Sequence, residues 1–436
     1  MSSATKRRLL LVTSSYAPVT MADMHRVRHL AWELPKQGWE VEVLAPNAEF
    51  QSSEYQEPGS EPLFNPEVPC HEVAPRDFWF FHLFNMRSIG WRALRPMAIA
   101  GVKLLKDHRF DLIYISTANF NLFCLGRWWG RQFNIPYVLD YHDPWVRDRV
   151  DYRTTPNRLK RWAAAVLSRW MEPHALKNAA GIVAVSPVYI EELRQRYGAL
   201  NCLQTSRCEV IPFAASEVDL VATKATADTQ TGSIEIVYTG AGGSIMAKSF
   251  LTICTALADV RRTDPVLFAR LKIHLFGTSP YWREGDGKPL QDIANSCGLA
   301  DIVREIPPRI TYLKAMELVQ QSDGLLILGV DDQGYMPSKL FSYLLSGKPL
   351  LACFCANSPP VDLFRHMPRL GHLMTFDPQS GVQPSGAAET MRRFLAEAAR
   401  REYFERRKLI ADYLAPAMAQ RHVALFERIC GAGCGT

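Results

Sequence analysis

Short apolar runs alternate with segments of helical periodicity along most of this chain. That order predicts parallel strands joined by crossover helices, because parallel neighbours cannot be joined by a tight hairpin. Predicted strands occupy residues 9–12, 41–44, 112–115, 137–139, 181–185 and 210–212, and then 234–238, 273–276, 325–328 and 350–352. Predicted helices occupy 24–37, 187–197, 248–261, 291–297, 311–321 and 339–345. The fold class is therefore α/β, with doubly wound parallel sheets.

The chain has 436 residues, more than one hydrophobic core usually holds, and this length predicts two domains. Residues 223–232 contain no large apolar side chain and predict a linker, after which the alternation restarts. We expect a first Rossmann-like domain over 1–215, a second over 216–410 and a terminal segment over 411–436. Ligands of such sheets bind at the carboxyl ends of strands and between domains, so we expect the site in a cleft where the two domains face each other.

Charge and cysteine content narrow the classes of partner. The net charge of +6 admits an anionic partner without predicting nucleic acid. The ten cysteines form no CxxC pair and have no histidine cluster beside them, so we predict reduced thiols and no metal site. The first apolar run, 9–12, is too short for a signal peptide or a membrane span. These features predict a cytoplasmic protein.

The segment 76–109 breaks the regular pattern. It mixes aromatic residues with arginine and lysine, and its aromatic residues are Phe78, Trp79, Phe80, Phe81, Phe84 and Trp91. This mixture is typical of a lipid–water interface, where rings lie at headgroup depth and cations meet anionic lipid. An ordinary insertion whose rings fill the core has the same composition, and stacking on RNA is a third interpretation. Peripheral membrane contact is the functional hypothesis for this segment.

His142 and Asp143 directly follow the predicted strand 137–139. This position is the carboxyl end of a parallel strand, where functional groups concentrate. A histidine there can hydrogen-bond a hydroxyl group or accept its proton, and a neighbouring carboxylate can orient the ring. A structural histidine is the alternative. We assign His142 and Asp143 as candidate catalytic residues.

Two further segments predict a phosphate site in the second domain. Gly242 and Gly243 lie in a glycine-rich turn after strand 234–238, and Lys248 begins the next helix. Such turns let backbone N–H groups approach a phosphate, although a tight connection needs glycine as well. In the second segment we expect Ser338 to cap a helix that begins at Lys339, with the lysine and the helix start both directed at a diphosphate.

The ordered series of motifs resembles the GT-B glycosyltransferases of the large group that includes the retaining family four. The matching runs are 9–13 with 16–18, 37–41, 111–114, 136–143, 183–186, 237–240, 274–277, 335–343 and 347–349. They span nearly the whole chain. The resemblance is therefore strongest for the fold.

The resemblance implies an acceptor domain followed by a nucleotide-sugar domain, and a final helix over 401–429 that returns to the first domain. It implies that His142 lies by the donor sugar and that Lys339 and Lys248 lie near its diphosphate. Tyr335 and Ser342 fall within the donor-binding motif. We also expect Arg26 to reach the acceptor side from the first helix. No metal or other cofactor is obligatory, because cations and a helix start can stabilise the departing diphosphate.

Departures from the family pattern keep more than one function open. The family often carries two glutamates around the donor-binding helix, and the matching positions here are Gly334 and Ser342. The family's arginine after the first strand of the second domain falls on Ala241. The first hypothesis is a glycosyltransferase that moves a sugar from a nucleotide diphospho-sugar to a hydroxyl on a lipid-linked or polysaccharide acceptor. The alternative is an inactive protein of this fold that binds nucleotide sugar or scaffolds polysaccharide assembly, and an epimerase is a third option.

Overall fold

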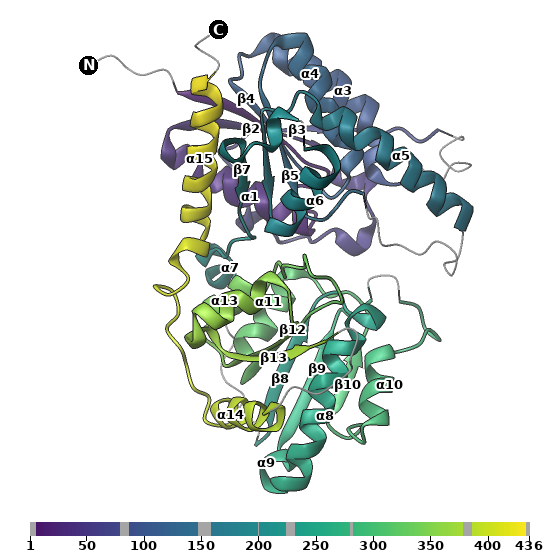
Figure 1. The fold of residues 1–436 in the computed structure, drawn as a ribbon, viewed down its shortest axis with the longest axis vertical. Coiled ribbons are helices and arrows are strands. Elements are labelled where there is room, and N and C mark those ends of the chain that lie inside the picture. The colour runs from purple at the N-terminus through teal and green to yellow at the C-terminus, as the bar shows by residue number, and fades with distance from the viewer. Residues whose placement is uncertain are drawn as a thin grey trace. The chain divides into compact units, whose positions relative to one another are not determined.

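The computed structural model describes residues 6–78, 87–146, 158–198, 200–223, 232–279, 282–377 and 386–432, with the backbone alone at 158–161 and 432. The chain forms two compact units (Figure 1). The first contains residues 1–213 and 415–436, and the second contains 214–414. Most of the predicted linker lies outside the described residues, as do Trp79, Phe80, Phe81, Phe84 and Cys434.

The N-terminal unit is built on a seven-stranded sheet in the order β3-β2-β1-β4-β5-β6-β7, and every pairing is parallel. Its strands are β1 (Arg7–Val12), β2 (Trp39–Pro46), β3 (Cys70–Val73), β4 (Leu112–Ser116), β5 (Tyr137–Tyr141), β6 (Gly181–Ala184) and β7 (Cys208–Val210). The strands β4, β5 and β6 are buried along their whole length. Full burial explains why they are continuous apolar runs rather than alternating ones.

Helices cover both faces of this sheet. They are α1 (Ala22–Glu33), α3 (Ile89–Asp107), α4 (Phe123–Phe133), α5 (Arg158–Leu176), α6 (Pro187–Tyr197) and α15 (Ala415–Ala432). The helices α3, α4, α5 and α6 share one core with side chains such as Ile113 and Ile115 of β4. Tyr114, which points to the opposite face, contacts His422 and Phe426 of α15. The expected helix 401–429 therefore begins only at Ala415.

The C-terminal unit contains a six-stranded parallel sheet in the order β10-β9-β8-β11-β12-β13. Its strands are β8 (Ile234–Thr239), β9 (Leu271–Phe276), β10 (Val303–Ile306), β11 (Gly324–Leu328), β12 (Leu350–Cys355) and β13 (His372–Phe376). Its helices are α7 (Glu217–Ala222), α8 (Ala247–Thr263), α9 (Pro265–Ala269), α10 (Pro289–Ser296), α11 (Tyr312–Gln321), α12 (Leu340–Leu345), α13 (Pro359–His366) and α14 (Ala387–Ala399).

Two cores lie on the opposite faces of the C-terminal sheet. One joins α8, α10 and α14, and the other joins α11, α12 and α13. Within the described residues, the stretch 243–263 around α8 is the single helix long and apolar enough to cross a membrane. Its inner face packs Phe250, Ile253 and Leu257 into the first of these cores. Helix α8 therefore has the packing of a core helix.

The predicted fold class is confirmed, since both units are parallel sheets covered on two faces by helices. The predicted helix 187–197 is also confirmed: the Ser186 side chain accepts a hydrogen bond from the Val188 N–H, and Pro187 lies in the first turn. The strand predicted at 210–212 lies two residues earlier, as β7. The nine described cysteines are all free thiols.

Candidate functional site

The predicted donor residues gather at the switch point of the C-terminal sheet. Strand β8 pairs with β9 on one side and with β11 on the other, so the chain order reverses between β8 and β11. The glycine turn 240–243 follows β8, and Asp331 follows β11. In open α/β sheets, ligands bind at the carboxyl ends of strands at such a reversal.

Lys339 lies against the end of β8. Its ammonium group donates a hydrogen bond to the Thr239 carbonyl oxygen and lies 4.2 Å from the centre of the Tyr238 ring. Gly240 has a φ of +115°, and a Cβ there would collide with the Lys339 ammonium. A residue without a side chain is therefore required at position 240 on two grounds, its backbone conformation and this close approach.

Ser338 does not cap the following helix, contrary to our prediction. Helix α12 begins at Leu340, its N-cap is Lys339 in a right-handed helical conformation, and no side chain caps it. Ser338 is exposed. An N-cap residue normally has extended backbone, which residues in the tight turn before α12 do not adopt. The cation at this site therefore comes from the N-cap residue itself, rather than from a residue inside the helix.

Burial perturbs the Lys339 ammonium. It lowers the pKa of Lys339 to about 7, because a cation loses hydration in this environment. Among the described residues, no carboxylate forms an ion pair with Lys339. A lysine held in this way gains its missing counter-charge when an anion binds.

The glycine turn is held in place through hydrogen bonds that lead to the buried carboxylate of Glu305. The Gly242 N–H donates to the Thr278 carbonyl oxygen at 2.9 Å, and the Thr278 hydroxyl donates to Glu305 at 2.6 Å. Glu305 also accepts hydrogen bonds from the backbone N–H groups of Leu290 and Gln291, at the start of α10. These contacts fix the turn in one conformation, in which Gly243 has a φ of +74°.

Lys248 stands in the first turn of α8. Its ammonium nitrogen lies 2.6 Å from Oδ2 of Asp331, and both side chains are about half exposed. This ion pair brings the ends of β8 and β11 together, as the prediction for Lys248 requires. A ligand phosphate at this position competes with Asp331 for the lysine.

The remaining predicted donor residues lie around α12. Tyr335 and Ser342 are both half-buried, the first in the loop before α12 and the second within it. Sequence reasoning missed Tyr343, whose buried hydroxyl lies 2.9 Å from the Thr239 nitrogen and 2.8 Å from its Oγ1. The aromatic residue next to Ser342 in α12 was the available signal. Tyr343 ties α12 to the end of β8, where Lys339 also bonds.

In the N-terminal unit, His142 is paired with Asp140 rather than with its neighbour Asp143. The His142 Nε2 lies 2.7 Å from Oδ2 of Asp140, and the Ser116 hydroxyl lies 3.1 Å from the same nitrogen. Asp143 is exposed, so our assignment of the orienting carboxylate was wrong. Adjacent residues in and after a strand point in opposite directions, and positions 140 and 142 share a side.

Arg26 is a buried structural cation and is not available to an acceptor, contrary to our expectation. Its side chain is completely buried, with Nε 3.2 Å from Oδ2 of Asp140. It also donates to the carbonyl oxygens of Ile211 at 2.6 Å and Pro212 at 3.1 Å. Burial alone would raise the pKa of Asp140, but Arg26 and the His142 ring hold it well below its usual range.

The buried network extends to the C-terminal helix. The Tyr114 hydroxyl lies 2.9 Å from Nε2 of His422, and His422 Nδ1 lies 2.8 Å from the Met418 carbonyl oxygen. Burial, helped by the positive charge of Arg26, lowers the pKa of His422 to about 3. His422 is therefore neutral, with Nδ1 donating to Met418 and Nε2 accepting from Tyr114. His142 Nδ1, in contrast, has no hydrogen-bond partner among the described residues.

Comparison with known proteins finds a family profile that matches part of the chain. The sequence profile described as Glycosyltransferase Family 4 matches residues 25–214, most of the N-terminal unit. The N-terminal unit is therefore similar to glycosyltransferase family 4. No curated protein matches the sequence.

Solved structures are similar in fold to this chain over nearly its full length. Sucrose-phosphate synthase from Thermosynechococcus elongatus is 15% identical, with a TM-score of 0.62 over 98% of this chain and 100% of that one. A glycosyltransferase from Rickettsia africae is 12% identical, with a TM-score of 0.57 over 98% and 99%. Anabaena HepE, solved in complex with UDP-glucose, is 15% identical, with a TM-score of 0.55 over 98% and 100%. The whole chain has the GT-B fold.

The N-terminal unit holds a second polar cluster that sequence reasoning missed. The buried carboxylate of Asp23 accepts hydrogen bonds from the hydroxyls of Ser14 at 2.6 Å and Ser15 at 2.5 Å. Asn119 donates to the Ser14 hydroxyl at 3.0 Å. This cluster lies at the ends of β1 and β4, the switch point of the N-terminal sheet. The serine pair directly after the first strand was the signal.

No group of three or more histidine, cysteine, aspartate or glutamate side chains within the described ranges is arranged to hold a metal ion. In the described part of the chain, the cations near the glycine turn include Lys339 and Lys248, the second of which is paired with Asp331.

Proposed function

We propose that this chain transfers a sugar from a nucleotide diphospho-sugar to a hydroxyl group of an acceptor. The observation that carries the proposal is the position of the Lys339 ammonium. It lies beside the glycine turn 240–243 at the switch point of the C-terminal sheet, partly buried, with no carboxylate partner in the described part of the chain. This environment favours a diphosphate as the missing anion.

In the proposed reaction, the bond between the sugar C1 and the diphosphate oxygen breaks, and a bond from C1 to the acceptor oxygen forms. The acceptor's hydroxyl proton passes to the departing diphosphate oxygen, and the nucleoside diphosphate leaves. Lys339 and Lys248 stabilise the negative charge that develops on the diphosphate, together with the N–H group of Gly243, while the Gly242 N–H holds the turn against Thr278. Preorganised cations and donors at a leaving group supply much of the rate enhancement in such sites, so this mechanism needs no metal ion.

His142 is proposed to hold a hydroxyl of the donor sugar. Asp140 fixes its Nε2, which leaves Nδ1 for the substrate. Asp140, which is completely buried, positions the ring and does not contact the substrate. The proposed donor class is a UDP-hexose, supported by the UDP-glucose held in the HepE structure. The proposed acceptor is a hydroxyl on a lipid-linked or polysaccharide chain.

A second candidate is a protein that binds nucleotide sugar without turnover. Gly334 and Ser342 occupy the two positions where the family resemblance places glutamates, so the ribose and the sugar lose two carboxylate contacts. The two candidates share the donor site and differ in catalysis.

The experiment that tests the proposal is a panel of nucleotide sugars, measured both for thermal stabilisation and for release of the nucleoside diphosphate with simple hydroxyl acceptors. Stabilisation together with release supports transfer. Stabilisation by one or more donors with no release across the panel supports the binding protein. The absence of any stabilisation contradicts both candidates, because both depend on the Lys339 site.

A further inference from the structure

Helix α5 carries a stripe of apolar side chains that are exposed rather than packed into the core. The exposed fractions are 57% for Trp162, 45% for Val166 and 67% for Trp170. Residues four apart lie on the same side of a helix, so these three form one continuous line. In Figure 1 the first half of α5 projects away from the sheet of the N-terminal unit. A core role for these side chains is excluded by their exposure.

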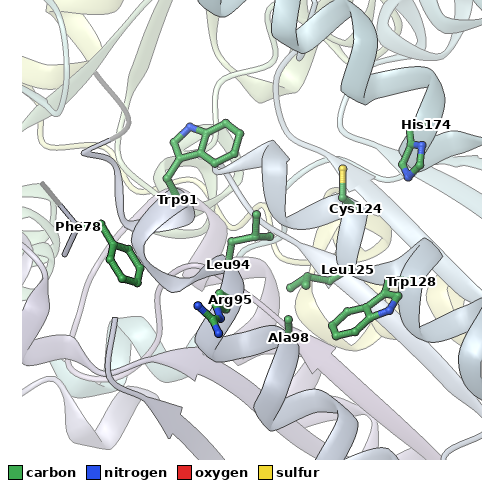
Figure 2. Close-up of a pocket in the computed structure, with 9 residues that line it drawn as sticks. All are labelled: Phe78, Trp91, Leu94, Arg95, Ala98, Cys124, Leu125, Trp128 and His174. Carbon is green, nitrogen blue, oxygen red and sulfur yellow. The ribbon is translucent and has the colours of Figure 1, made fainter. Parts of the chain in front are cut away.

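The stripe leads into an apolar pocket. The Trp170 ring stacks on His174, one turn further along, with ring centres 5.8 Å apart. His174 lines a pocket of about 650 Å³ together with Trp91, Leu94 and Arg95 of α3 and Leu125 and Trp128 of α4. Figure 2 shows these side chains, which come from three neighbouring helices. Trp128 is itself 47% exposed, so the apolar surface continues from α5 onto α4.

Positive charge surrounds this surface. Helices α3, α4 and α5 contain four, two and four arginines and lysines, respectively, and two acidic residues, Asp107 and the buried Glu172. Their net charge of +8 exceeds the chain's net charge of +6, so the remainder of the chain is net negative. Partial burial and the cations Arg127, Arg131 and Lys177 lower the pKa of His174. Positive charge is therefore concentrated on the α3, α4 and α5 side of the N-terminal unit.

We propose that this face, formed by α3, α4 and α5, docks on an anionic lipid bilayer. Trp162 and Trp170 lie at headgroup depth, the cations around them contact lipid phosphates, and the pocket beside His174 receives an acyl chain. Exposed tryptophans on helices in which arginine and lysine outnumber acidic residues match the chemistry of that interface. The pocket walls match a hydrocarbon chain. The proposal does not depend on the proposed transfer reaction.

The test is flotation of the full-length protein with vesicles of phosphatidylcholine and phosphatidylglycerol, beside vesicles of phosphatidylcholine alone. We expect binding to the anionic vesicles, much weaker binding to the neutral ones, and loss of binding as salt is raised. The double variant Trp162→Ala/Trp170→Ala should bind the anionic vesicles at least about tenfold more weakly. Folding should be unaffected, because both rings are exposed.

The matched control is Val266→Ala/Tyr403→Ala, which removes two exposed apolar side chains of the C-terminal unit, 77% and 67% exposed. It should bind vesicles as the unchanged protein does. The proposal is overturned if the protein ignores anionic vesicles at low salt, or if the tryptophan variant binds them normally. It is also overturned if sedimentation shows a dimer that Trp162→Ala/Trp170→Ala converts to a monomer, since a second copy would then cover the face.

Discussion

Oδ2 of Asp140 lies 2.7 Å from Nε2 of His142, and the same oxygen lies 3.2 Å from the guanidinium of Arg26. One buried carboxylate therefore holds a candidate substrate-binding ring on one side and a structural cation on the other. The carboxylate stabilises the fold and orients His142, while Nδ1 of the ring stays without a partner among the described residues. Stability and function can be separated by changing the two partners independently.

Replacing Asp140 should destabilise the protein strongly. Asp140→Asn leaves the completely buried Arg26 without its counter-charge, and removing one partner of a buried pair costs about 3–5 kcal/mol in the free energy of unfolding. Urea denaturation measures this loss. The control is Asp301→Asn, which breaks an exposed pair with Arg261 and should cost about 1 kcal/mol or less. Equal effects of the two substitutions would contradict a buried ionic centre.

The contribution of Asp140 should persist into the acid range. Arg26 and His142 hold the pKa of Asp140 below its usual range in the folded protein. As pH falls, the Asp140 carboxylate of the unfolded chain therefore takes up a proton at a higher pH than that of the folded protein does. The stability advantage over Asp140→Asn is full above about pH 4, the ordinary pKa of aspartate, and is lost as pH falls further. Unfolding free energies measured across this range test the sign. If the stability advantage over Asp140→Asn disappeared near neutral pH, the result would contradict this prediction.

Replacing His142 should lower turnover with little loss of stability. His142→Ala removes the proposed hydrogen bond to the donor sugar, for which we expect a drop of roughly tenfold to a hundredfold in kcat/KM. Asp140 keeps Arg26 as its partner in this variant. The exposed His366 gives a matched control, and His366→Ala should leave kcat/KM unchanged. A normal kcat/KM in His142→Ala would remove the residue from the site.

A side chain at Gly240 should displace the Lys339 ammonium. Gly240→Ala places a Cβ against it and also strains a backbone with a φ of +115°. We expect more than about tenfold weaker binding of UDP in calorimetry, with about 1–3 kcal/mol lost in stability. Gly59 has a φ of +93° with nothing within 4 Å of its Cβ position, so Gly59→Ala isolates the backbone strain. That control should lose stability and keep UDP binding.

The pKa of Lys339 predicts a pH dependence of nucleotide binding. Burial lowers this pKa to about 7, and a bound diphosphate, by supplying negative charge, should raise it again. UDP binding therefore takes up a proton near neutral pH, and affinity falls by up to about tenfold per pH unit as pH rises above 7. Calorimetry in buffers of different ionisation enthalpy measures the proton uptake. Proton release in the same range would contradict this account.

The sequence predicted the centre of each sheet and missed strands at its edges. The strands β1, β4, β8 and β11 are largely buried, so each is rich in apolar residues. The edge strands β3, β10 and β13 contain polar or charged residues such as His71 and Arg304 and are partly exposed. A short strand at the edge of a sheet lacks this apolar composition, so its sequence alone does not predict a strand. It is recognised only in the structure, by its pairing with the neighbouring parallel strand.

The sequence predicted where the candidate site residues lie along the fold better than it predicted which side chains contact each other. Residues that follow central strands, such as Lys339, His142 and Gly240, lie where the alternation of strands and helices placed them. The errors concern side-chain direction. Arg26 and Asp143 were assigned from nearness in sequence, but pairing in the fold joins Arg26 to Asp140, far away along the chain. Periodicity does not contain that information.

The most direct test of the central claim is UDP binding measured with Lys339→Met, beside Lys272→Met. Lys272 is exposed near the amino end of β9, whereas the site lies at the carboxyl ends of the strands. Methionine keeps the apolar volume of lysine and removes a buried charge, so the melting temperature of Lys339→Met should not fall. We predict that Lys339→Met loses UDP binding while Lys272→Met retains it. Normal UDP affinity in a folded Lys339→Met protein would contradict the account.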